Sequence, residues 1–148
     1  MKYALKDIDI DEFNIKTHLS KIEKYSILIK TKMNQLKELE QFSNNLGCTN
    51  LGSVISVTNK ITDNTSKNAI KKIDLIKSIR EDIVKYTLRK NDIINDIKKL
   101  DNTNYLNILM LKYVELLSFE EIAVRLNYSY DYVRKMHKKA IYSLKELI

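Results

Sequence analysis

The side chains best suited to bind a ligand lie near the end of the 148-residue chain, after Ser129. At 100° per residue, one face of the helix expected there carries four charged side chains and a tyrosine: Asp131, Arg134, Lys135, Lys138 and Tyr142. The opposite face carries apolar side chains: Val133, Met136, Ala140, Leu144 and Leu147. A helix that only covers a core would scatter both signs of charge on its outer face, whereas this one gathers cations. Such a face indicates binding to a polyanion.

If the polyanion is DNA, these groups would act in two ways. Side chains near the start of the helix would reach base edges in the major groove: Tyr130, Asp131, Arg134 and Lys135. Arginine and lysine donate to guanine, aspartate accepts from cytosine N4, and the tyrosine would stack on a sugar or a thymine methyl group. A second set would contact phosphates: Arg125, Ser129, Lys138 and Lys139. His137, at the edge of the apolar face, is expected to make a packing or phosphate contact.

Two helix starts in quick succession position these side chains. Ser118, with Glu121 three residues later, is typical of a capping box. Ser129 is the second expected N-cap. Between the two helices the chain must turn sharply, and Asn127 is the best non-glycine residue for the left-handed conformation that such a turn uses. Ala123 would let the second helix approach closely, so the pattern predicts a helix-turn-helix.

At these residues the sequence resembles region 4 of bacterial sigma factors. The matching segments are LNILMLKYVELL, EEIAVRL and, after a short turn, SYDYVRKMHKKAIYSLKEL. Over residues 66–148 the chain is similar to small phage proteins of low-GC Gram-positive bacteria, related to the RinA and ArpU late-transcription regulators, which join a coiled helical segment to a region-4-like end. The resemblance implies a phage- or prophage-encoded regulator that binds a promoter region and switches late genes.

The sequence departs from the sigma pattern at three positions. Asn127 replaces the usual turn glycine, which is sterically acceptable. Tyr130 and Asp131 stand where sigma factors usually begin base reading with an Arg-Glu pair, so a different DNA element is expected. No module resembling the promoter-melting region is evident in residues 1–100, and the chain is not expected to act as a complete sigma factor.

Two long amphipathic stretches precede this segment. Apolar residues spaced three and four apart predict one helix over residues 15–41 and a second that ends near residue 100. Between them, residues 42–67 lose this periodicity and are expected to form a loop, with a short extended piece at 54–57. Residues 1–12 have few apolar anchors and are expected to be a frayed lead-in.

These elements predict an all-α protein in two parts. Residues 1–100 would form a long antiparallel helical hairpin or coiled coil, and residues 101–148 a helix-turn-helix DNA-binding module, with Asn102 or Thr103 capping its first helix. The long helices could pair within one chain or between two chains.

Composition excludes several classes of protein. The chain has no proline and only two glycines, which disfavours turn-rich sheet folds and excludes glycine-rich phosphate loops. A single cysteine, Cys48, cannot form an internal disulfide, and His18 and His137 cannot build a zinc site. We expect no metal or cofactor, no membrane span and a cytoplasmic location. No catalytic constellation is present, so an enzyme is the least favoured class.

The formal net charge of +7 also favours an anionic partner. Residues 1–100 carry 19 cations and 13 anions, whereas residues 101–148 carry 7 and 6, so most of the excess lies outside the motif. The favoured function is a sequence-specific DNA-binding regulator that dimerises, or contacts RNA polymerase, through its long helices. A ring-forming small terminase-like packaging protein and a protein-interaction module that binds polymerase without DNA contact are the alternatives.

Overall fold

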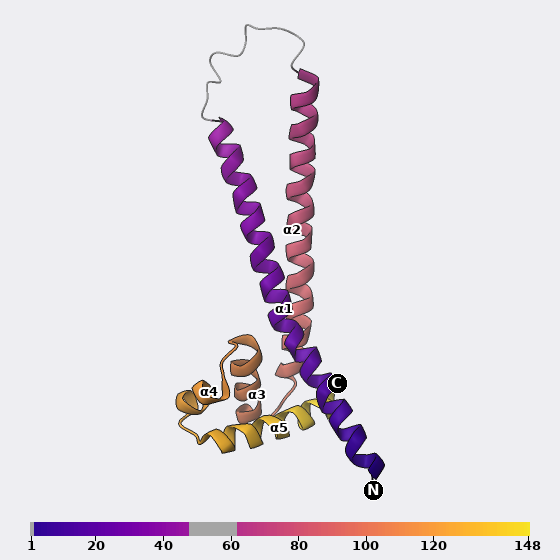
Figure 1. Ribbon diagram of the computed structural model, residues 1–148, viewed down its shortest axis with the longest axis vertical. Helices are drawn as coiled ribbons and strands as arrows, with labels where there is room; N and C mark the ends of the chain where they lie inside the picture. The colour runs from indigo at the N-terminus through magenta and orange to yellow at the C-terminus, as the bar shows by residue number, and fades with distance from the viewer. Residues whose placement is uncertain (1, 48–61) are drawn as a thin grey trace. The chain divides into compact units, whose positions relative to one another are not determined.

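A computed structural model describes the backbone of residues 2–47 and 62–148, and the side chains of residues 12–42 and 66–148. Throughout these residues the regular structure is helical, which confirms the predicted all-α class (Figure 1). The elements are α1 (Lys2–Gly47), α2 (Thr62–Lys98), α3 (Thr103–Leu109), the π-helix η1 (Met110–Val114), α4 (Phe119–Leu126) and α5 (Tyr130–Leu147). None of the described helices combines the length and the apolar character that a membrane span requires.

The two long helices extend further than the sequence predicts. Helix α1 begins at Lys2, so the expectation of a frayed lead-in over residues 1–12 is wrong for the described backbone. Helix α1 also continues to Gly47 and α2 starts at Thr62, which shortens the predicted 42–67 loop at both ends. Once a helix is nucleated, each further residue adds a hydrogen bond, and no proline stops either helix. The extended piece expected at 54–57 lies outside the described residues.

Contacts between residues divide the chain into two compact units, Met1–Ser26 with Thr87–Ile148 and, separately, Ile27–Tyr86. In the second unit, α1 and α2 run antiparallel and are joined by polar contacts. The Lys32 ammonium lies 2.9 Å from the Asp82 carboxylate, and the Arg80 guanidinium lies 3.0 Å from that of Glu40. Ile79 is buried in this unit.

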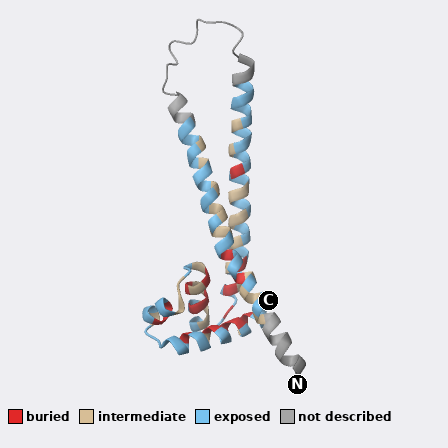
Figure 2. Cartoon of the chain, in the orientation of Figure 1, coloured by how far each residue is buried: buried red, intermediate tan, exposed pale blue. Residues whose placement is uncertain are grey.

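The first unit has a core to which both long helices contribute (Figure 2). Its buried residues come from α1, the end of α2, the short segment after α2, α3, η1 and α5. They are Leu19, Ile22, Ile93, Ile97, Leu100, Leu109, Tyr113, Ala140, Ile141 and Leu144. Packing is therefore continuous across residue 100, where the sequence predicts a boundary between modules. Leu19 and Ile22 of α1 and the C-terminal end of α2 therefore share one core with α3, η1 and α5.

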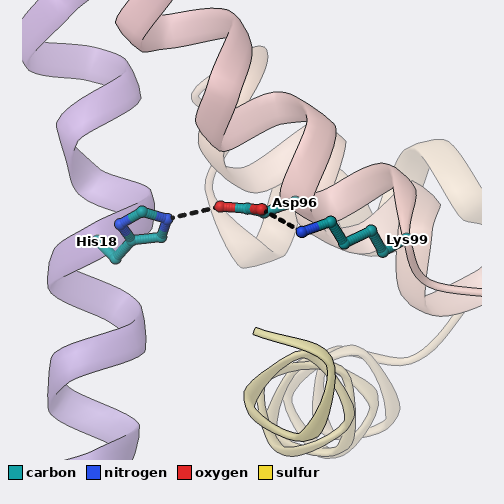
Figure 3. A network of polar contacts seen from close by, with 3 residues as sticks. All are labelled: His18, Asp96 and Lys99. Atoms are coloured by element: carbon teal, nitrogen blue, oxygen red, sulfur yellow. Dashed lines mark hydrogen bonds and ion pairs between the residues drawn. The ribbon is translucent and has the colours of Figure 1, made fainter.

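A polar network at the edge of this core joins α1 to α2 (Figure 3). Nε2 of His18 lies 3.1 Å from Oδ2 of Asp96, and Nζ of Lys99 donates to Oδ1 of Asp96 at 2.8 Å. Partial burial of the Asp96 carboxyl opposes its ionisation, but the hydrogen bonds from Lys99 and His18 outweigh this and lower its pKa. The ionised carboxylate therefore bridges the two helices.

Candidate functional site

Helix α4 begins at the predicted capping box. The Ser118 N–H donates to Oε2 of Glu121 at 2.7 Å, and the Glu121 N–H donates to Oγ of Ser118 at 3.2 Å. These reciprocal hydrogen bonds satisfy two free backbone donors, and the bond that the Ser118 N–H donates lowers the pKa of the Glu121 carboxyl. Asn102 caps α3, because its Oδ1 accepts hydrogen bonds from the N–H groups of Asn104 and Tyr105.

The turn between α4 and α5 has the backbone conformation that the sequence predicts. Asn127 is left-handed, with φ 57° and ψ 43°, and the Tyr128 N–H donates to the Ala123 carbonyl at 2.9 Å. Ser129 is the N-cap of α5, because its hydroxyl accepts a hydrogen bond from the Tyr132 N–H at 3.3 Å. The buried Ala123 lies in the contact between the two helices. These features fix the direction in which α5 leaves α4.

Replacing Asn127 tests the importance of this turn. We expect Asn127→Ala to lower the free energy of unfolding by about 1–2 kcal/mol, because a β-carbon without a local polar partner disfavours the left-handed conformation. Asn127→Gly should match the wild type within about 0.5 kcal/mol, since glycine adopts this conformation readily. Urea denaturation followed by circular dichroism measures both. Equal stability of the alanine and glycine variants would contradict the assigned role.

The inner face of α5 attaches it to the rest of the unit. Five of its side chains are buried: Val133, His137, Ala140, Ile141 and Leu144. Val133 belongs to a second apolar cluster together with Ile108, Leu111, Ile122 and Ala123. The predicted division of α5 into an inner and an outer face is confirmed, except that Leu147, in the last turn, is exposed.

His137 is a core residue. Its side chain is only 4% exposed, its Nε2 lies 3.1 Å from the Tyr113 hydroxyl, and its ring centroid is 5.1 Å from that of Phe119. Burial, with Lys16 and Lys112 nearby, lowers the pKa of the imidazole to about 4 although Glu12 opposes the shift. Of the two roles predicted for His137, packing is confirmed and the phosphate contact is wrong, because the ring is enclosed.

The outer face of α5 brings together four of the predicted site residues. Asp131, Arg134, Lys135 and Lys138 line an open hollow of about 320 Å³, and all four are exposed. The guanidinium carbon of Arg134 lies 5.7 Å from the centroid of the Tyr130 ring, within the range of a cation–π contact. Tyr130 in turn meets Phe119 edge to face, with centroids 6.5 Å apart. The Arg134 side chain thus has an aromatic support anchored beside the core.

The other predicted phosphate ligands lie outside this hollow. Arg125 forms an ion pair with Glu115, and Ser129 uses its hydroxyl oxygen as the cap of α5. Lys139 is exposed but does not line the hollow. The sequence does not predict the pairing of Arg125 with Glu115, because the two residues are ten positions apart and belong to different parts of the fold.

The sequence also does not predict the form of the connection that precedes α4. Helix α3 continues into the π-helix η1, and Leu116 then adopts a left-handed backbone with φ 60°. Nζ of Lys112 donates to the Leu117 carbonyl at 3.3 Å and lies 4.5 Å from the centroid of the Phe119 ring. The Lys112 ammonium therefore contacts both the connection and the first residue of α4. Apolar spacing alone does not distinguish a π-turn from an α-turn, so the sequence carried no clear signal for it.

Comparison with known protein families, curated proteins and solved structures gave no match to this chain. Within the described residues, no three side chains of His, Cys, Asp or Glu are placed together so that they could hold a metal ion. The hollow on the outer face of α5 presents four charged side chains, with Tyr130 next to Arg134.

Proposed function

We propose that the chain is a sequence-specific DNA-binding transcriptional regulator. In this proposal α4, the turn at Asn127 and α5 form a helix-turn-helix, and α5 enters the major groove of double-stranded DNA. The observation that carries the proposal is the hollow on the outer face of α5, where Asp131, Arg134, Lys135 and Lys138 converge while the opposite face is held in the core.

The arrangement of these side chains suits base reading. The residues proposed to contact bases lie in the first turns of α5, the part of a recognition helix that approaches base edges. Arg134 is held against Tyr130, so less conformational entropy is lost when its guanidinium binds guanine. Lys138, one turn further along, would contact phosphate and fix the position of the helix on the duplex.

The sequence resemblance supplies the biological setting of the proposal. It indicates a regulator of late genes in a phage or prophage, acting in the cytoplasm near RNA polymerase. The long helices, arranged as an antiparallel hairpin within residues 1–100, would mediate self-association or contact polymerase, and residues 101–148 would carry DNA recognition.

Selection of bound fragments from a library of host and prophage DNA, at about 150 mM salt to suppress non-specific binding, tests the proposal. We expect recovery of a discrete site upstream of an operon, with a two-fold repeat if the protein binds as a dimer. Recovery of no sequence above background would contradict the proposal and favour a protein-binding role. Binding of DNA only by a ring-shaped oligomer would favour the packaging alternative.

A further inference from the structure

One face of α2 carries apolar side chains that the chain leaves exposed. Ile70, Ile73, Val84 and Leu88 recur at helical spacing on the side opposite to the buried Ile79. Each is between 58% and 64% exposed. Single exposed apolar residues are ordinary, but an aligned row of them on one helix is typical of a helix-binding surface.

Two charged residues, Lys77 and Glu81, lie on the same face between the two apolar pairs. We call this row the α2 seam: Ile70, Ile73, Lys77, Glu81, Val84 and Leu88. Lysine precedes glutamate by four positions, which is the weaker order for an ion pair within a helix. Among the described side chains, neither Lys77 nor Glu81 has an ion-pair partner.

The α2 seam is nearly symmetric about residue 79. If a second α2 runs antiparallel with its midpoint at the same residue, Ile70 lies opposite Leu88, and Ile73 lies within one residue, about 1.5 Å along the axis, of the position opposite Val84. The same alignment places Lys77 of each copy opposite Glu81 of the other. The two charge contacts are therefore equivalent, as a two-fold symmetric interface requires. A parallel alignment would place Lys77 opposite Lys77 and Glu81 opposite Glu81, which is repulsive.

The flank of the seam has the same symmetry. Asp74 and Lys85 lie on one side of it, both are exposed, and neither has an ion-pair partner among the described side chains. In the antiparallel alignment about residue 79, Asp74 of one helix lies beside Lys85 of the other. Four complementary charge contacts therefore accompany the apolar ones, which favours a second copy of this chain over an unrelated helix.

We propose that two copies of the chain associate through their α2 seams as an antiparallel, two-fold symmetric helix pair. The contact extends from residue 70 to residue 88, about 27 Å of helix. The inference extends the proposed function, since a two-fold dimer would present two recognition helices to two half-sites, but the association itself requires no DNA. Failure of one proposal is therefore distinguishable from failure of the other.

Sedimentation equilibrium of the full chain without DNA, between about 1 and 100 μM, tests the association. We expect a monomer–dimer equilibrium for the wild type. Lys77→Glu should raise the dimer dissociation constant about tenfold, because two attractive contacts become repulsive, and Lys77→Glu with Glu81→Lys should restore it. Lys30→Glu, the same charge change at an exposed position of α1, is the matched control and should leave dimerisation unchanged. A monomeric wild type, or a loss that the double reversal does not restore, would overturn the proposal.

Disulfide cross-linking tests the antiparallel direction. In a background in which Cys48 is replaced by serine, a mixture of Ile70→Cys and Leu88→Cys chains should form a cross-linked heterodimer on mild oxidation. Ile70→Cys alone should not cross-link, because its two copies would lie about 27 Å apart. Efficient cross-linking of Ile70→Cys to itself would show a parallel pair and overturn the proposed geometry.

Discussion

Arg134→Ala combined with Lys135→Ala is expected to weaken binding to the selected DNA site at least about 100-fold. Each side chain is proposed to contact a base edge, and a good contact of this kind contributes roughly 1–3 kcal/mol of discrimination. Both side chains are exposed and line the hollow on α5. The loss should be specific, with the remaining weak affinity resembling that for random DNA. A fluorescence anisotropy titration with the selected site and with a scrambled duplex measures both quantities.

A matched control distinguishes the loss of base contacts from the loss of positive charge. Lys30→Ala with Lys37→Ala removes the same two charges from exposed positions on α1, and we expect less than about a fivefold effect on specific binding. Thermal unfolding of the Arg134 and Lys135 double variant should match the wild type, because neither side chain belongs to the core. Equal loss of specific binding in both double variants would show that charge alone drives association with DNA.

Acidification is expected to destabilise the first unit through His137. The pKa of this imidazole is about 4 in the folded protein, against 6.5 for an unperturbed histidine. The unfolded chain therefore binds the proton more readily, and stability is lost as the pH falls from about 6.5 to about 4. A shift of this size corresponds to about 3 kcal/mol, fully present above pH 6.5. Urea denaturation at a series of pH values should show this decline.

A variant that lacks both His137 and its hydrogen-bond partner Tyr113 is the control for this prediction. Tyr113→Phe with His137→Phe replaces both partners of the buried hydrogen bond by apolar rings, so that neither polar group is left unpaired. We expect the double variant to lose most of the pH dependence that His137 adds between pH 4 and 6.5. The same decline in wild type and double variant would assign the acid sensitivity to carboxyl groups such as Glu12 and Asp96, whose pKa values are lowered.

Local features of the fold were predictable from sequence. The caps at Ser118 and Ser129 and the left-handed Asn127 each depend on neighbours within a few positions, where residue type determines which backbone hydrogen bonds can form. The two faces of α5 also follow from helical periodicity. The grouping of Asp131, Arg134, Lys135 and Lys138 in one hollow could be anticipated for the same reason, because all four belong to one helix.

Long-range contacts were not predictable in this way. Leu19 and Ile22 of α1 join the same core as Ala140 and Leu144 of α5, more than a hundred positions away in the chain. The Tyr113–His137 hydrogen bond and the Arg125–Glu115 ion pair likewise cross between elements. Periodicity shows that a residue has a buried side but not which segment covers it. The sequence therefore predicts which side chains of α5 share a face and that Ala123 lies against α5, but not the residues of α1, α2 and η1 that share its core.

The shared core also determines whether residues 101–148, proposed to bind DNA, can fold when moved to another protein. A fusion protein that transplants residues 101–148 alone would carry Leu109, Ile141 and Leu144 without the α1 and α2 side chains that cover them. Such a cassette would present an apolar surface and tend to aggregate. A graft that keeps residues 12–26 and 87–148 together carries the covering side chains with it. Residues 12–26 of α1 and 87–98 of α2 therefore belong to the same folded unit as α5.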